Sequence, residues 1–234
     1  MIRLGVTGTD TGVGKTMASC AIAAGFRHAG LRVAAMKPVE TGVAADDPTR
    51  DGARLARAAG GLLPLSVVAP LVYPDPLAPS EAARRVGSTV DLSILDHAVR
   101  AASSQTQALI VEGAGGLLVP VVDRLAFDTL FVRWSLELIV VAANKLGVIN
   151  HTRLTLAAAR AAGLVVRAVL LNNVNPTPDQ SAPDNARIIA ELEDIAVVEL
   201  PWLSNVDDLD AVSDLILANV FPELERPSRS SARR

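Results

Sequence analysis

The sequence predicts an α/β fold, doubly wound around a mostly parallel sheet. The chain has 234 residues, of which 50% are hydrophobic and only 3% aromatic, so its core must be aliphatic. Short aliphatic runs alternate with longer helix-type patterns, as expected where helices cover both faces of a parallel sheet. Polar, glycine-rich segments directly follow the aliphatic runs. In such sheets ligands bind beyond the carboxyl ends of the strands, so these segments are the candidate functional regions.

Six aliphatic runs are expected to form strands, and eight periodic segments are expected to form helices. The strands span about 2–7, 32–36, 108–112, 138–142, 166–171 and 195–199. The helices span about 14–29, 51–59, 79–85, 91–103, 126–134, 150–162, 184–193 and 208–219. Segment 43–79 is rich in Pro, Gly and Asp and is expected to be a long excursion with one short helix. We expect a single domain over residues 1–225 and a disordered basic tail over residues 226–234.

Composition excludes several classes of partner. The formal net charge of −3 provides no general basic field for nucleic acid. The single cysteine, Cys20, excludes an internal disulfide and is expected to be a buried, inert thiol. No apolar run reaches the length of a membrane span, and because an apolar strand begins within the first three residues we expect no signal peptide. We therefore expect a cytoplasmic protein with neither a membrane nor a nucleic acid as its partner.

The first strand leads into a glycine-rich loop, GTDTGVGKT, and then into an Ala-rich helix. Gly12 and Gly14 permit backbone conformations that turn amide groups inward, and such a concavity at a helix N-terminus binds phosphate. Lys15 would reach the terminal phosphates, and Thr16 would place a hydroxyl on Mg²⁺. Five residues separate Gly8 from Gly14, one more than in the usual phosphate-binding pattern. The loop predicts a P-loop NTPase-like protein that binds a nucleoside triphosphate. It does not indicate which molecule accepts the phosphoryl group.

The second strand ends at Lys37, within the segment AAMKPVETG. Pro38 prevents a helix from starting there, so the chain must turn outward through a short polar loop that Thr41 and Gly42 complete. A lysine at this strand end, beside a phosphate loop, is placed to meet a γ-phosphate. On this segment alone, a surface lysine at a turn explains the pattern equally well.

The central strand ends at Glu112 and is expected to pass into a glycine-rich turn, within IVEGAGGLLVP. A carboxylate at this position, across from the phosphate loop, is the natural Mg²⁺ ligand. Gly113, Gly115 and Gly116 would let the backbone approach a ligand closely. Asp51, at the start of the helix after the second strand, is a second carboxylate candidate, although by itself it is better explained as a helix N-cap.

A later helix begins within the segment NKLGVINHT. Exposed amides near Asn150 and Thr152 could hold an anion such as a carboxylate, but routine capping by Asn150 explains the sequence better. His151 has no second histidine at metal-ligand spacing, and the chain contains no zinc pattern and no Ser-His-Asp arrangement.

Taken together, these segments resemble the dethiobiotin synthetase family. The matching runs are VTGTDTGVGKT, KPVETG, VEGAGGLLVP, LGVINHT, LNN at 171–173 and PWL at 201–203. They occur in the family's order and spread over most of the chain, and the family's own loop carries the same five-residue spacing.

The resemblance implies an ATP- and Mg²⁺-dependent cyclo-ligase of biotin biosynthesis. It implies closure of the ureido ring of dethiobiotin from 7,8-diaminopelargonic acid and CO₂ or bicarbonate. One substrate amine captures CO₂ as a carbamate, and the carbamate attacks the γ-phosphate to give a mixed carbamic-phosphoric anhydride and ADP. The second amine then closes the ring and expels phosphate. The resemblance also implies a homodimer that binds its substrate at the subunit interface.

The resemblance assigns roles to individual residues. The ATP contacts are Gly12, Val13, Gly14, Lys15, Thr16, Glu112, Gly113, Ala114, Gly115, Asn172, Asn173, Pro201, Trp202, Leu203 and Asp208. Within this set, the two asparagines read the adenine. The metal ligands are Thr16, Asp51 and Glu112, and Lys37 and Lys15 are the catalytic residues. The substrate contacts are Thr11, Lys37, Thr41 and, from the partner subunit, the segment Gly147, Val148, Ile149 and Asn150. Asp46 and Asp47 are rivals of Asp51, and the segment around Pro79 fits the family's substrate side only loosely.

Three other functions compete with this one. Switch ATPases of the partitioning or division type have a phosphate loop with a lysine two residues after its first position. This chain has Thr11 at that place if the loop is counted from Thr9, and Asp10 if it is counted from Gly8. An amidotransferase of the cobyrinate type needs a glutaminase domain with a nucleophilic cysteine, and this chain is too short and contains only Cys20. A non-enzymatic nucleotide-binding module would not require Lys37 and Glu112 at two separate strand ends.

Overall fold

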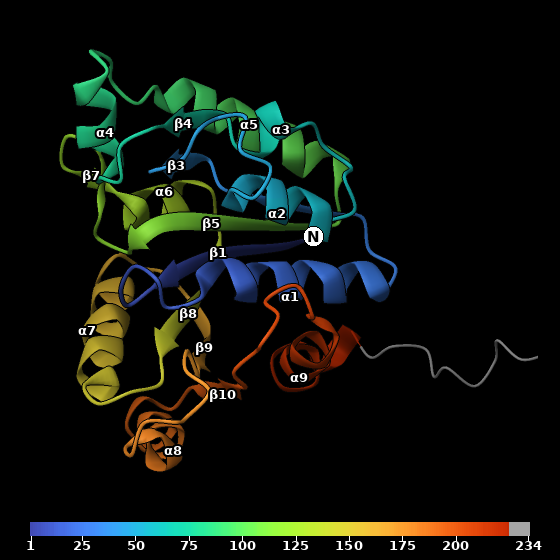
Figure 1. The fold of residues 1–234 in the computed structure, drawn as a ribbon, viewed down its shortest axis with the longest axis vertical. Helices are drawn as coiled ribbons and strands as arrows, with labels where there is room; N and C mark the ends of the chain where they lie inside the picture. Colours follow the sequence, from blue (N-terminus) through green and yellow to red (C-terminus); the bar gives the residue numbers. More distant parts are fainter. Residues whose placement is uncertain (225–234) are drawn as a thin grey trace, which may run out of the picture.

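The structure is a computed structural model that describes residues 1–224 (Figure 1). Its centre is a six-stranded sheet in the order β10-β9-β8-β1-β5-β2, in which all neighbouring strands are parallel. The strands are β1 (Ile2–Gly8), β2 (Val33–Met36), β5 (Ala108–Gly116), β8 (Glu137–Ala143), β9 (Val166–Asn172) and β10 (Ala196–Leu200). Each corresponds to a strand expected from the sequence, and the α/β fold class is confirmed. The expected tail, 226–234, lies outside the described residues.

Helices flank this sheet. They are α1 (Lys15–His28), α2 (Asp51–Ala58), α3 (Leu65–Val68), α4 (Pro79–Arg85), α5 (Leu92–Gln105), α6 (Phe127–Arg133), α7 (Val148–Ala161), α8 (Ala182–Glu193) and α9 (Asp210–Val220), with a short 3₁₀ turn at Pro222–Leu224. Helix α1 packs between α2 and α9 and against β1, β2 and β5, whereas α7 packs against α8, β8 and β9. No helix within residues 1–224 is long and apolar enough to cross a lipid bilayer.

The core is aliphatic, as the composition requires. Residues 138–142 of β8 are completely buried, and so are residues 168–171 of β9. Unbroken apolar runs of this kind form where a parallel strand is covered on both faces. The few large aromatic side chains in the core lie mainly on the helices, as Phe26 does on α1 and Phe127 and Phe131 do on α6.

The structure corrects the expected elements at several places. Strand β5 does not end in a turn after Glu112 but continues to Gly116, which pairs with Gly8 of β1 beyond a register shift. The excursion 43–79 contains α3 as well as α2, and its strand β4 (Leu71–Tyr73) pairs in parallel with β3 (Val39–Thr41). A small hairpin joins β6 (Pro120–Val122) to β7 (Leu125–Ala126). The additional strands contain only two or three residues, too few to show the apolar alternation that marks a strand in a sequence.

The strand order explains where the site forms. Strand β1 lies between β5 and β8, and β5 lies between β1 and β2. The carboxyl ends of β1, β5 and β2 therefore meet at one edge of the sheet. These are the ends that carry the glycine-rich loop, Glu112 and Lys37, so three segments far apart in the sequence come together.

Candidate functional site

The glycine-rich loop joins β1 to α1 through two left-handed backbone positions. Gly12 has φ +75° and Gly14, the residue that caps α1, has φ +98°. Such conformations favour glycine, because a Cβ atom would crowd the following carbonyl group. The side-chain amide of Asn172, at the end of β9, donates to the backbone oxygen of Val13 at 3.0 Å and holds the loop from the far side. The loop thus turns around the N-terminus of α1, where backbone amides favour an anion.

A substitution at Gly14 tests this packing. We expect Gly14→Ala to destabilise the protein more than Gly12→Ala, because a Cβ atom at Gly14 would lie 2.2 Å from the Asn172 amide nitrogen. Nothing lies within 4 Å of a Cβ atom at Gly12, so Gly12→Ala should cost only the left-handed strain, about 1–2 kcal/mol. Loss of the Asn172 bond adds about 1–2 kcal/mol at Gly14. Urea unfolding of both variants measures the difference, and equal losses would contradict it.

Lys15 begins α1 and lies almost completely buried beneath the loop. Its Nζ donates to the backbone oxygen of Asp10 at 2.9 Å. Burial, partly opposed by the charge of Glu112, lowers the pKa of Lys15 below its ordinary value. A bound anion would supply the negative charge that this ammonium group lacks in its buried position.

Lys37, Glu112, Asp51 and Thr16 form one connected polar cluster. Lys37 Nζ donates to Glu112 Oε1 at 3.0 Å and also pairs with Asp51 Oδ2, while Thr16 Oγ1 donates to Glu112 Oε1 at 2.8 Å. Lys37 is therefore not a surface lysine. Asp51 is not a helix cap, because it is the first residue of α2 and the cap position belongs to Arg50.

The two carboxylates fix the charge of Lys37. Burial by itself favours the neutral amine, but Glu112 and Asp51 outweigh it and raise the pKa of Lys37 above its ordinary value. The carboxyl group of Asp51 behaves in the opposite sense, since Lys37 overcomes the effect of burial and lowers its pKa. Lys37 and Asp51 are thus both charged at neutral pH. Among the described residues, Glu112 Oε2 is buried without a hydrogen-bond partner, as expected of an oxygen that would coordinate a cation.

A buried ion pair that the sequence analysis did not predict fixes the start of α2. Arg50 Nη1 donates to Glu40 Oε2 at 2.5 Å, and the backbone amide of Gly52 donates to Glu40 Oε1 at 3.1 Å. The side chains of Glu40 and Arg50 are only 2% and 4% exposed. Because Asp51 lies between Arg50 and Gly52, Glu40 holds both of its neighbours in place.

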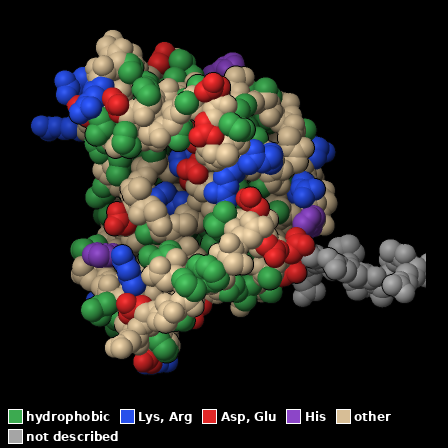
Figure 2. Space-filling view, in the orientation of Figure 1, with side chains coloured by type: hydrophobic (Ala, Val, Ile, Leu, Met, Phe, Trp, Pro, Cys, Tyr) green, Lys and Arg blue, Asp and Glu red, His purple; other side chains and the backbone are tan. Residues whose placement is uncertain are grey.

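Lys15 and the cluster of Lys37, Glu112, Asp51 and Thr16 line one cavity of about 720 Å³ at the sheet edge. Figure 2 shows acidic and basic side chains gathered near the middle of this face of the molecule. Of the residues assigned to the site, the cavity brings together Thr11, Gly12, Gly14, Lys15, Thr16, Lys37, Thr41, Asp51, Glu112, Ala114 and Gly115. The rivals of Asp51, Asp46 and Asp47, do not line it.

Other assigned residues lie outside this cavity. They are Val13, Gly113, Asn172, Asn173, Pro201, Trp202, Leu203, Asp208 and the segment from Gly147 to Asn150. Asn173 belongs to a side-chain network at the carboxyl ends of β8 and β9, in which Asn144 Nδ2 donates to Asn173 Oδ1 at 3.2 Å and Asn185 donates to Asn144 Oδ1 at 2.9 Å. Asn172 meets this network only through its backbone oxygen, which accepts from the Asn144 amide at 2.8 Å. Asn150 does not cap α7, because the helix already begins at Val148 after a left-handed Gly147.

The cavity also contains residues that the sequence analysis did not assign. They are Met17, Arg54, Pro76, Leu77, Ala78, Pro79, Val119 and Val206. The sequence contains a pattern that could have identified Arg54 as a site residue. It lies three residues after Asp51, and residues at that spacing share one face of a helix. Pro79 occupies the first position of α4, as the proline in that segment suggests.

Known proteins resemble this chain over most of its length. A family model described as an AAA domain matches residues 3–210. The ATP-dependent dethiobiotin synthetase BioD of Anaeromyxobacter sp. (strain Fw109-5) is 46% identical over 192 residues, covering 82% of this chain and 86% of that protein. The protein of the same name from Bacillus cereus (strain B4264) is 37% identical over 195 residues, covering 83% of this chain and 81% of that protein.

Solved structures agree on the fold. The structure of apo McdA from Cyanthece, at 12% identity, superposes with a TM-score of 0.51 over 97% of this chain and 96% of that chain. This likeness concerns the α/β fold alone, whereas the sequence identities above extend to a family. The chain belongs to the family of ATP-dependent dethiobiotin synthetases.

Proposed function

We propose that this protein closes the ureido ring of dethiobiotin from 7,8-diaminopelargonic acid and CO₂, consuming ATP in biotin biosynthesis. The observation that carries this proposal is the cluster of Lys37, Asp51, Glu112 and Thr16 in one cavity with Lys15. A protein that only binds nucleotide has no use for a second buried lysine at this position. The relatives are named dethiobiotin synthetases, so the rival function as a switch ATPase is not favoured.

Phosphoryl transfer in this site would depend on positioning and charge. A carbamate formed on one amine of the substrate attacks the γ-phosphate, and the two anions repel each other unless cations lie between them. Lys15 and Lys37 both line the cavity and supply two such cations. The carbamate is already anionic, so no strong general base is needed. This agrees with a cavity whose described lining contains no histidine.

We propose Mg²⁺ as the metal and Thr16, Asp51 and Glu112 as the residues that hold it. Their oxygens are the hard ligands that Mg²⁺ prefers, and the unpartnered Glu112 Oε2 fits a coordinating atom. When bound, Mg²⁺ supplies positive charge to the β- and γ-phosphates of ATP. Lys37 pairs with both carboxylates, so a cation held by Asp51 and Glu112 would weaken these pairs and leave the Lys37 ammonium group available to the phosphoryl group.

The remaining assignments concern the ends of the two substrates. We propose that Thr11 and Thr41, on the cavity wall, contact the diamine, and that Asn172, Asn173 and the segment 201–203 receive the adenine. We further propose a homodimer in which the segment from Gly147 to Asn150 contacts the substrate of the partner subunit. In support, this segment lies outside the cavity of its own chain, and Asn150 is exposed. Because the reaction consumes ATP, we propose that it takes place in the cytoplasm.

One assay tests the function. Purified protein is mixed with ATP, Mg²⁺ and bicarbonate, and ADP release is measured with and without 7,8-diaminopelargonic acid. We expect ADP release only with the diamine, together with dethiobiotin in equal amount, because the carbamate is the phosphoryl acceptor. A reaction without bicarbonate is the control. ADP release that does not depend on the diamine would contradict the proposal and favour a switch ATPase.

A further inference from the structure

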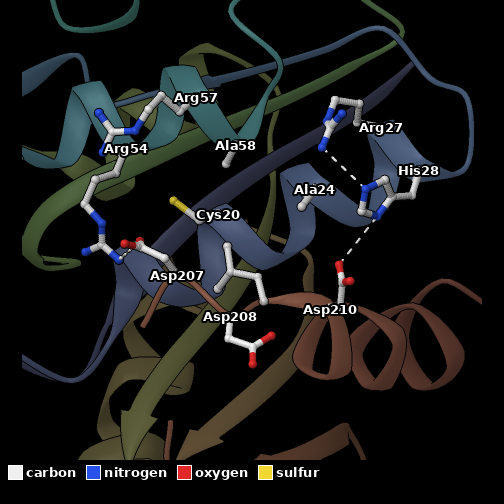
Figure 3. Close-up of a pocket in the computed structure, with 11 residues that line it drawn as sticks. Cys20, Ala24, Arg27, His28, Arg54, Arg57, Ala58, Asp207, Asp208 and Asp210 are labelled. Atoms are coloured by element: carbon white, nitrogen blue, oxygen red, sulfur yellow. Dashed lines mark hydrogen bonds and ion pairs between the residues drawn. The ribbon is translucent and has the colours of Figure 1, made fainter. Parts of the chain in front are cut away.

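A second cavity adjoins the first one on the outer side of α1. It has a volume of about 530 Å³ and lies between α1, α2 and the segment just before α9. Figure 3 shows Cys20 pointing into this groove from α1 and Arg54 reaching across it from α2 toward Asp207. Arg54 lines both cavities, so its side chain stands at the boundary between the groove and the proposed ATP site.

The present contacts of Arg54 are weak. Its Nη2 lies 3.4 Å from the backbone oxygen of Val206 and 3.4 Å from Asp207 Oδ1. The side chain of Asp207 is 72% exposed, and an ion pair so exposed to water contributes little to stability. Arg54 can therefore exchange this carboxylate for another anion at small cost.

Without a bound metal, the lining of the proposed ATP site owes its net positive charge to Arg54. The charged side chains among the described residues that line its cavity are Lys15, Lys37, Asp51, Glu112 and Arg54. The two lysines are formally matched by the two carboxylates, so Arg54 alone gives this lining a net positive charge. Among the cations of this lining, Arg54 is the one without a matching carboxylate, so it is available to a triphosphate that enters the cavity.

The position of Arg54 also fits a phosphate. It shares the cavity with Thr16 and Met17, in the first turn of α1, and with Val206 in the β10–α9 loop. Phosphates are expected at this helix N-terminus, and the planar guanidinium group can bind two phosphate oxygens at once. We propose that Arg54 is a nucleotide ligand that leaves Asp207 to bind a phosphate of ATP or ADP. This inference rests on the proposed ATP dependence of the protein.

Affinity measurements on three variants test the proposal. ADP binding with Mg²⁺ is measured by calorimetry without the diamine, so that turnover plays no part. Arg54→Ala should bind ADP about tenfold more weakly than the wild type, as expected for the loss of a charge-assisted hydrogen bond. Asp207→Asn should bind ADP at least as tightly as the wild type, because Arg54 no longer has to leave a carboxylate.

Arg57→Ala is the matched control. Arg57 lies three residues further along α2, donates to the backbone oxygen of Pro48 at 2.8 Å and lines only the outer groove of the two cavities. The Arg57→Ala substitution removes the same charge as Arg54→Ala but not the proposed phosphate contact, so the ADP affinity of this variant should stay within about twofold of the wild type. Equal losses in Arg57→Ala and Arg54→Ala would mean a general field effect and would overturn the proposal.

Trp202 provides an independent readout on the same loop. Its side chain is 42% exposed, whereas Trp134, the other tryptophan of the chain, is 5% exposed, so iodide quenching reports mainly on Trp202. If Arg54 leaves Asp207 to bind a phosphate, pyrophosphate with Mg²⁺, which has no adenine to cover Trp202, should change Trp202 quenching in the wild type and change it less in Arg54→Ala. If Arg54→Ala binds ADP as tightly as the wild type and shows the same quenching change, only the inference about Arg54 is overturned. A wild type that fails to bind ADP would overturn the ATP dependence as well.

Discussion

A Lys37→Ala variant is expected to turn over about 10²- to 10³-fold more slowly than the wild type at saturating ATP, diamine and bicarbonate. The variant loses the ammonium group that pairs with Asp51 and Glu112, the carboxylates proposed to hold Mg²⁺, and that is proposed to meet the γ-phosphate. Its loss also leaves Glu112, which is completely buried, with Thr16 as its remaining hydrogen-bond donor. The measurement is the rate of dethiobiotin formation. An unchanged rate would show that Lys37 has no part in the transfer.

Two measurements separate this catalytic effect from a loss of fold. Removing one partner of a buried ion pair costs about 3–5 kcal/mol, so the thermal midpoint of Lys37→Ala is recorded alongside its rate. ADP affinity should change little, because the glycine-rich loop and Lys15 remain. Lys15→Ala should behave differently and lose both ATP affinity and rate, since Lys15 lies directly beneath the loop. An unaltered ATP dissociation constant in Lys15→Ala would argue against its assignment.

A Glu40→Ala variant is expected to lose about 3–5 kcal/mol of its free energy of unfolding. The substitution leaves the guanidinium group of Arg50 buried without its counter-ion and frees the backbone amide of Gly52. Because Asp51 lies between these two residues, the variant should also bind Mg²⁺ more weakly. Urea unfolding gives the stability, and Mg²⁺ titration of the ADP complex gives the metal affinity. A loss below about 1 kcal/mol would show that water already compensates the pair.

The double variant Glu40→Met/Arg50→Met is the matched control for this pair. Replacing both charges with apolar side chains of similar size removes the uncompensated charge, so most of the stability should return. The hydrogen bond from the backbone amide of Gly52 to Glu40 stays absent, so the weaker Mg²⁺ binding should persist. Such a separation of stability from metal affinity would assign Glu40 a positioning role at Asp51.

The sequence predicted many of the residues that the structure gathers in one cavity, because its segments carry local chemistry. A glycine-rich loop between an apolar strand and a helix predicts phosphate binding, and Gly12, Gly14, Lys15 and Thr16 all line the cavity. The strands were equally clear, because a parallel strand buried on both faces must be apolar throughout. The extension of β5 beyond Glu112 was missed, since glycines usually interrupt a strand and here they pair with β1 instead.

Only the tertiary structure decided how distant side chains meet. The sequence could not distinguish a surface lysine from a buried one at Lys37, or a helix cap from a cluster member at Asp51. The strand order β1-β5-β2 settled both, because it brings two strand ends and the start of α2 to one edge of the sheet. The Glu40–Arg50 pair and the bridge from Arg54 to the β10–α9 loop likewise join elements without a local pattern. Motifs such as the glycine-rich loop consist of consecutive residues and can be recognised in a sequence. Ion pairs and hydrogen bonds between distant residues depend on distances that only the folded chain defines.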